Sequence, residues 1–149
     1  MTPPPRRYLV LLAEDNPGDV YLVREALREH GLDVDLQVFD DGEKVFALIE
    51  LTAGDPSRPV PDLILLDLNL PKRVGHEVLG KVRSTKCMEH VPVLLLSSSE
   101  SPQDKETART LGATGYFQKP TSLDDFLKLG KVARDCLQGK VPSADSSGN

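Results

Sequence analysis

The segment PDLILLDLNLP, at residues 61–71, places a carboxylate at the end of an apolar run. Four consecutive apolar residues without alternation predict a strand that is buried on both faces, and Asp67 follows them directly. A carboxylate in an apolar environment is costly unless it has a partner. We therefore expect Asp67 to lie at a strand end that opens to water or to a cation.

Other apolar segments also end on polar residues. The first, YLVLLA, is followed by Glu14 and Asp15. A later segment, VPVLLLS, ends at Ser97, and the segment GYFQK ends at Lys119. The carboxyl ends of parallel strands meet at one edge of a sheet, where ligands bind. We expect these residues to form one site with Asp67.

The residue types of this site are those of phosphoryl transfer. Three converging carboxylates repel one another, and a hard divalent cation removes the conflict. Mg²⁺ binds through one or two carboxylates together with water and phosphate oxygens, so it suits an open acidic site. A metal ion and a carboxylate nucleophile beside a lysine and a hydroxyl group are the equipment for this reaction. Asp67 is the expected phosphoryl acceptor.

Strands and helices must alternate along the chain to bring these residues together. Apolar segments predict strands at 8–14, 33–39, 62–67, 91–97 and 115–119. Capping residues, prolines and glycines predict helices at 17–30, 42–51, 75–85 and 102–111, and a last one that begins near Ser122. Five such units predict an α/β fold, a doubly wound parallel sheet with helices on both faces. The strand at 33–39 alternates between apolar and polar residues, so it belongs at an edge, which favours the order 2-1-3-4-5.

Length predicts a single domain between two flanking segments. A chain of 149 residues fits one domain with a substantial core. Three prolines near the start predict an extended arm at residues 1–7. The small and polar end of the sequence predicts a flexible tail at 139–149. The domain itself is expected at 8–138.

Composition excludes several classes of partner. A formal charge of −5 and a pI of about 5.2 argue against nucleic-acid binding. Apolar runs are too short for a membrane span, and the N-terminus lacks the apolar core of a signal peptide. Cys87 and Cys136 have no metal-binding or redox spacing, so we expect two reduced thiols. These features together predict a cytoplasmic protein.

Four motifs, AEDN, LLDLNLP, VLLLSSS and YFQKP, resemble in their order and spacing the receiver domain of bacterial two-component response regulators, the CheY-like family. The resemblance covers residues 8–137 and implies the flavodoxin-like or CheY-like (βα)₅ fold. It implies that a sensor histidine kinase phosphorylates Asp67 in a phosphorelay. It also implies that Glu14 and Asp15, with Asp67 and the backbone carbonyl of Asn69, hold Mg²⁺, for which Mn²⁺ or Ca²⁺ can substitute.

The remaining site residues take their roles from the same resemblance. Ser97 occupies the position of the switch hydroxyl and Tyr116 that of the switch aromatic, although a core aromatic is the plain alternative for Tyr116. Lys119 is expected to contact the phosphoryl group. The bond before Pro120 is expected to be cis, a minority form.

Longer segments, AEDNPGDVYLVREAL and LNLPKRVGHEVLGKVR, resemble the single-domain regulators that accompany bacterial phytochromes. The kinase would then be a bacteriophytochrome, and a homodimer through the strand 4 to helix 5 side would be expected. Val74 departs from the pattern, because these proteins often have Asp before the glycine. That position belongs to a loop.

Three other functions fit these residues less well. A phosphatase that uses an aspartyl-phosphate intermediate would need a second acid at position 69, where Asn69 cannot transfer a proton. A flavin mononucleotide carrier would need a glycine- or hydroxyl-rich loop after the first strand, and EDNPGD repels phosphate instead. The third is a degenerate receiver that only binds, and the complete set of acids, hydroxyl and lysine argues against it. The expected protein is a phosphoacceptor with autocatalytic phosphotransfer and self-dephosphorylation, not a dedicated enzyme.

Overall fold

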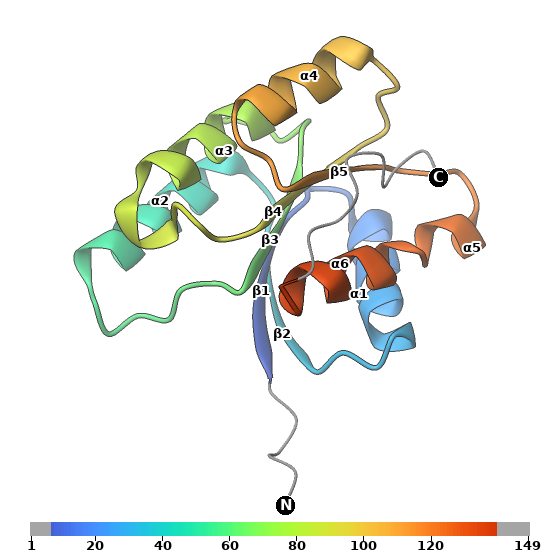
Figure 1. The fold of residues 1–149 in the computed structure, drawn as a ribbon, viewed down its shortest axis with the longest axis horizontal. Coiled ribbons are helices and arrows are strands. Elements are labelled where there is room, and N and C mark those ends of the chain that lie inside the picture. Colours follow the sequence, from blue (N-terminus) through green and yellow to red (C-terminus); the bar gives the residue numbers. More distant parts are fainter. Residues whose placement is uncertain (1–6, 140–149) are drawn as a thin grey trace, which may run out of the picture.

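The structure, a computed structural model, describes residues 7–139 of the chain. Five strands form one parallel sheet in the predicted order, β2-β1-β3-β4-β5 (Figure 1). The strands are β1 (Tyr8–Ala13), β2 (Val34–Phe39), β3 (Leu63–Asp67), β4 (Val93–Ser97) and β5 (Gly115–Gln118). The predictions of an arm at 1–7 and a tail at 139–149 lie outside the described residues, except for Arg7 and Gly139.

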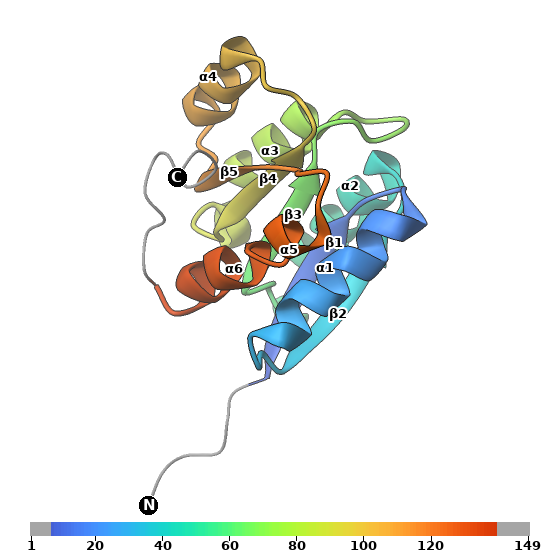
Figure 2. The same ribbon diagram turned by 90° about the vertical axis from the view of Figure 1, so that its right-hand side faces the viewer.

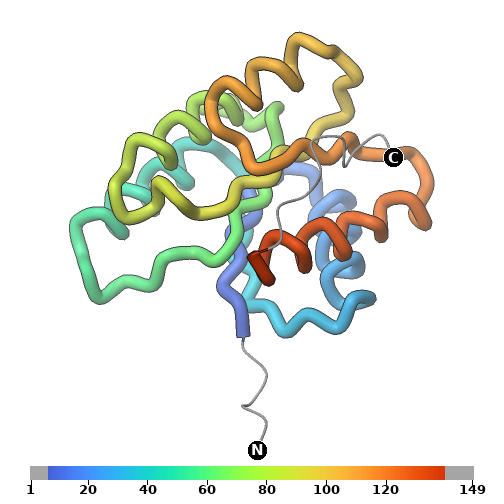
Figure 3. Tube along the Cα trace, viewed as in Figure 1, coloured from blue at the N-terminus to red at the C-terminus, as the bar shows by residue number. Residues whose placement is uncertain are grey.

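Helices follow every strand of the sheet. They are α1 (Pro17–Glu29), α2 (Gly42–Gly54), α3 (Gly75–Ser84), α4 (Pro102–Thr110), α5 (Leu123–Phe126) and α6 (Leu129–Leu137), with a short 3₁₀ helix, η1 (Lys86–Met88), before β4. The tube trace in Figure 3 shows how the chain winds from one to the next, with a long connection between α2 and β3. The predicted alternation is confirmed.

One prediction about the helices is wrong, because the segment after β5 forms two helices instead of one. Between them, Lys128 N donates to Asp125 O at 3.2 Å, and Gly130 N donates to Leu127 O at 3.1 Å. These i to i−3 bonds are the tighter 3₁₀ type, which interrupts the α-helical pattern. Gly130 also lets α6 approach α1 closely, since a Cβ there would lie 2.2 Å from Ala26 O.

Two apolar layers enclose the sheet. Helices α2, α3 and α4 cover one face, and α1, α5 and α6 cover the other (Figure 1). Figure 2 shows α1 and α6 side by side, as their contacts require. All residues of β3 and β4 are buried, whereas the exposed residues of β2 alternate with half-buried ones. This confirms that β2 is an edge strand and that the central strands serve as a rigid support for their carboxyl ends.

The turn from β1 into α1 is closed by a side-chain cap. Asn16 Oδ1 accepts hydrogen bonds from Gly18 N at 2.8 Å and from Asp19 N at 3.1 Å, and Pro17 occupies the first turn. Both are standard ways to begin a helix. Only three residues separate β1 from α1, so the first turn of α1 lies beside the carboxyl edge of the sheet.

Residues 7–139 also bear on the cysteines, on membrane-spanning helices and on the bond before Pro120. Both cysteines are free thiols, as expected, with Cys87 exposed and Cys136 buried. Every helix in this part of the chain is too short or too polar to cross a membrane. A cis bond before Pro120 was expected and is wrong, because these residues contain no cis peptide bond. Trans is the lower-energy form of a bond before proline.

Candidate metal and phosphoryl site

The strand ends lie together because the register of the sheet aligns them. Ala13 pairs with Leu66, so Glu14 follows β1 beside the end of β3 at Asp67. Ser97 closes β4 opposite Gln118, and Lys119 N donates to Ser97 O at 2.7 Å. The structure therefore brings the predicted residues of four strands to one edge of the sheet.

Lys119 is bound to three carboxylates at this edge. Its Nζ lies 2.5 Å from Glu14 Oε1, 2.8 Å from Asp19 Oδ2 and 3.1 Å from Asp67 Oδ2. We call these four residues the Lys119 cluster. The side chains are 10 % exposed for Lys119, 0 % for Glu14, 7 % for Asp67 and 25 % for Asp19. A cation shared among several buried carboxylates strongly favours its charged form.

Burial and charge shift the protonation of this cluster. Burial, followed by the hydrogen-bonding contact with Asp67, raises the pKa of Glu14 to about 7, although Lys119 acts in the opposite direction. Burial alone would lower the pKa of Lys119, but the hydrogen bonds to Asp19 and Glu14 and the charge of Asp67 outweigh it and raise that pKa above its usual value. One ammonium group therefore does not fully neutralise the acids around it.

A divalent cation fits the acids that the sequence predicted as its ligands. Carboxylate oxygens of Glu14, Asp15 and Asp67 all lie within 4.8 Å of one another. Glu14 and Asp67 are buried and Asp15 is exposed, so the group is open on one side. Oxygen ligands with one side free for water are what Mg²⁺ and similar hard cations prefer. The structure brings together all three predicted carboxylate ligands.

The β3–α3 connection shapes the site on its other side. Asn69 N donates to Asp67 Oδ1 at 2.9 Å, which fixes the carboxylate that Lys119 contacts through Oδ2. Asn69 itself is exposed. Gly75 begins α3 directly against β3, where a Cβ would lie 2.7 Å from Asp67 O. This close approach explains why glycine follows Val74, whose own side chain is exposed.

Ser97 and Tyr116 both contact Ser99 in the β4–α4 connection. Ser97 is buried, and its Oγ accepts a hydrogen bond from Ser99 N at 3.0 Å. Tyr116 is also buried, and its hydroxyl donates to Ser99 O at 3.2 Å. Ser99 Oγ in turn donates to Asp104 Oδ2 at 2.7 Å. Through Ser99, the predicted switch hydroxyl and switch aromatic are joined in one hydrogen-bonded chain.

Residues 10–130 match the family described as the response regulator receiver domain. The chain belongs to this family. As a receiver domain, it serves as a phosphoacceptor in two-component signalling, which is consistent with the acids and lysine at the strand ends. The resemblance seen in the sequence motifs is confirmed, as is the CheY-like fold.

Individual members of the receiver family are similar to this chain over most of its length. The response regulator Rcp1 of Synechocystis sp. is 34% identical over 126 residues, which are 85% of this chain and 84% of that protein. The phosphorylated cyanobacterial phytochrome response regulator RcpA has a TM-score of 0.79 at 30% identity, covering 89% of this chain and 95% of that one. The Mn²⁺-bound form of Rcp1 has a TM-score of 0.76 at 32% identity, covering 86% and 92%. This receiver domain is thus similar to a phytochrome response regulator, RcpA, and to a response regulator, Rcp1, that binds Mn²⁺.

Sequence reasoning missed Asp19, the third partner of Lys119. Asp19 lies in the first turn of α1, where an acid is favourable whatever else it contacts, so its residue type alone does not indicate a role in the site. Side chains on a helix point toward its N-terminus, so a residue in the first turn of α1 reaches back over the strand ends. That direction, together with the short β1–α1 turn, is the signal that could have identified it.

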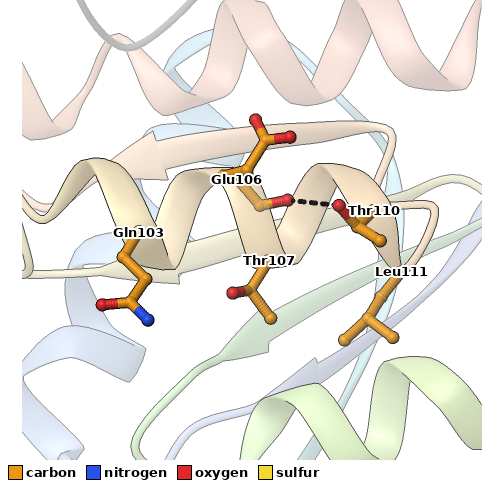
Figure 4. A pocket seen from close by; sticks show the side chains of 5 residues that line it. All are labelled: Gln103, Glu106, Thr107, Thr110 and Leu111. Atoms are coloured by element: carbon orange, nitrogen blue, oxygen red, sulfur yellow. Dashed lines mark hydrogen bonds between the residues drawn. The ribbon is translucent and has the colours of Figure 1, made fainter.

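A hollow elsewhere on this receiver domain contains none of the site residues. It has a volume of about 290 Å³ and lies along α4. Figure 4 shows its lining residues, which are Gln103, Glu106, Thr107, Thr110 and Leu111. The Thr110 hydroxyl is occupied by a hydrogen bond to Glu106 O at 2.9 Å. The residues expected to bind a metal or accept a phosphoryl group therefore lie at the strand ends and not in this hollow.

Proposed function

We propose that Asp67 is the residue of this receiver domain that accepts a phosphoryl group from a sensor histidine kinase, with Mg²⁺ as the metal. The observation that carries the proposal is the Asp67 carboxylate at the end of a rigid, fully buried strand, with the Lys119 ammonium at 3.1 Å. A nucleophile, a cation and neighbouring metal ligands in one place are what phosphoryl transfer requires.

Each residue of the site has a part in the transfer. A carboxylate oxygen of Asp67 attacks the phosphorus, the bond from phosphorus to the kinase imidazole nitrogen breaks, and its electron pair stays on that nitrogen. Lys119 donates N–H bonds to the phosphoryl oxygens, and the Ser97 hydroxyl donates another. Glu14, Asp15, Asp67 and the Asn69 carbonyl would hold Mg²⁺, which would supply positive charge for the phosphoryl oxygens.

Movement of Ser97 toward the phosphoryl group is the proposed switch. In this structure Ser97 Oγ accepts from Ser99 N, and Ser99 O accepts from Tyr116. Displacing Ser97 would loosen Ser99 and release the Tyr116 hydroxyl, so the β4–α4 connection would rearrange. The readout is a changed protein-binding surface on the β4 to α6 side, which a homodimer could use.

A phytochrome-type kinase in the cytoplasm is the proposed partner. Support comes from the likeness to the phytochrome response regulator RcpA and to the bacteriophytochrome response regulator RtBRR, which is 31% identical with a TM-score of 0.70. The acidic net charge disfavours nucleic acid as a further partner. Asn69 offers no second acid, so self-dephosphorylation and not turnover of a substrate is the proposed hydrolytic activity.

Incubation with acetyl phosphate tests the acceptor. We expect intact mass to show one added phosphoryl group on the wild type with Mg²⁺, and none without Mg²⁺ or in Asp67→Asn. Asp40→Asn removes an exposed aspartate that follows the edge strand β2 and should be labelled like the wild type. A label that persists in Asp67→Asn would overturn the assignment of the acceptor.

A second experiment tests the partner. It compares the rate of phosphoryl transfer to this protein from a phosphorylated bacteriophytochrome kinase with the rate from an unrelated histidine kinase.

A further inference from the structure

Asp19 contacts the site, but it is not one of the residues expected to bind the metal or to accept the phosphoryl group. Its carboxylate bonds the Lys119 ammonium at 2.8 Å across 100 residues of sequence. The three acids close enough to share a metal ion are Glu14, Asp15 and Asp67, and Asp19 is not one of them. Asp19 therefore touches the lysine of the site but neither the nucleophile nor the expected metal position.

The ammonium of Lys119 has all of its hydrogen-bonding capacity in use. An ammonium group carries three N–H donors, and the structure gives Lys119 Nζ three carboxylate partners. Two of them, Glu14 and Asp67, are expected metal ligands. In this arrangement the lysine is paired with carboxylate oxygens of two residues that a divalent cation would need as ligands.

Metal binding and the position of Lys119 therefore conflict. A divalent cation among those oxygens would repel an ammonium group held against Glu14 and Asp67. The Lys119 side chain is 10 % exposed, so losing its partners without a replacement would leave a buried cation unpaired. A carboxylate outside the metal ligands would resolve the conflict.

We propose that Asp19 is a positioning residue that retains the Lys119 ammonium when a divalent metal takes over Glu14 and Asp67. The inference rests on the proposed metal site and deepens it. Asp19 keeps one N–H bond throughout, and the other two donors turn from the metal ligands toward the phosphoryl position. The carboxylate thereby strengthens metal binding through the lysine, without coordinating the metal.

Two simpler roles for Asp19 make different predictions. An acid in the first turn stabilises α1 through the helix dipole, which affects folding and not the metal. A negative charge near the site also attracts a cation directly, but that effect does not require Lys119. Coupling between Asp19 and Lys119 in metal affinity distinguishes the proposal from both.

A double-mutant cycle on Mg²⁺ affinity, measured by calorimetry, tests the coupling. Asp19→Asn should weaken Mg²⁺ binding about tenfold in the wild-type background and less than about twofold in Lys119→Met, a difference typical of residues in contact. Asp19→Ser serves as a second variant because serine is well tolerated in a first helical turn. Glu29→Gln removes an equal charge at the far end of α1 and should leave the affinity within about twofold of the wild type.

Each outcome decides the proposal. Equal losses in both backgrounds would show a direct charge effect and overturn the inference, while leaving the metal site in place. No Mg²⁺ binding by the wild type would overturn the metal site and the inference with it. The NMR correlation between Lys119 ¹⁵Nζ and its ammonium protons gives an independent measurement on folded protein, because it is seen when a hydrogen bond holds the ammonium. With saturating Mg²⁺ this correlation should persist in the wild type and disappear in Asp19→Asn. Its loss in both would also overturn the proposal.

Discussion

Two ion-pair networks lie near the carboxyl edge of the sheet, and they differ in solvation. The Lys119 cluster is almost closed to water, since its lysine side chain is 10 % exposed. The Arg73 network joins Arg73 to Glu43 of α2 at 2.8 Å and to Glu77 of α3 at 3.2 Å, with the arginine side chain 39 % exposed. Both place one cation among several acids. The comparison indicates that burial, more than the number of pairs, decides which network governs stability and chemistry.

Removing the central cation of the buried network should have the largest effect. Lys119→Met leaves Glu14, Asp19 and Asp67 without their shared partner, and breaking a buried pair costs about 3–5 kcal/mol. Glu14 can take up a proton, so we expect a loss of about 2–3 kcal/mol in the free energy of unfolding at pH 8 without metal. Denaturant unfolding at that pH measures it.

Added Mg²⁺ and a surface control sharpen that measurement. Mg²⁺ should restore most of the stability of Lys119→Met, because the cation replaces the missing charge. Lys128→Met removes an exposed lysine that pairs with Asp125, and it should unfold like the wild type. A loss of similar size in both variants would contradict the contrast between buried and exposed networks.

Glu14 should make metal binding depend on pH. Its pKa in the folded, metal-free protein is raised from 4.5 to about 7. Protonation of Glu14 therefore adds to the free energy of unfolding fully below pH 4.5, and this contribution is lost as the pH rises through about 7. A metal ion must displace this proton. Below pH 7 we expect the dissociation constant for Mg²⁺ to rise by up to about tenfold per pH unit, and above pH 8 to level off.

Calorimetry at pH 6, 7 and 8 checks this dependence. Glu14→Gln, which cannot exchange a proton, should bind Mg²⁺ more weakly but with a flatter profile over the same range. Parallel profiles for the two proteins would assign the dependence to another group. With Mn²⁺ the affinity of the wild type should again depend more steeply on pH than that of Glu14→Gln, because the proton competes with either cation for the Glu14 carboxylate.

The sequence allowed the sheet and most of the site to be predicted, for physical reasons that particular residues show. Alternation of apolar and polar residues in β2 predicted an edge strand, which its exposure confirms. The unbroken apolar run of β3 predicted a fully buried strand, so the acid at its end, Asp67, stood out. Parallel strands align their ends, so Glu14 and Lys119 could be placed beside Asp67 without knowledge of any contact.

The features that escaped prediction depend on side-chain direction and on local packing. Asp19 reaches the site only because α1 starts so close to β1 and its side chain turns back toward the helix start. The break between α5 and α6 follows from tight bonds around Gly130 where it meets α1. Neither follows from hydrophobic periodicity, which reports which face of an element is buried and not what a polar side chain contacts.

Breaking the exposed network should have the smallest effect. Arg73→Gln removes contacts to Glu43 and Glu77 and the stacking of the guanidinium over Phe46, 4.5 Å from the ring centroid. Exposed ion pairs contribute little, and we expect the melting temperature to fall by no more than about 3 °C. Calorimetric scans in low and high salt measure it. The difference in melting temperature between the wild type and Arg73→Gln should be smaller in high salt, because salt screens the exposed ion pairs but not the stacking on Phe46. A larger fall, unaffected by salt, would mean that the loop between β3 and α3 depends on Arg73 as strongly as the strand ends depend on Lys119, and the distinction drawn from burial would fail.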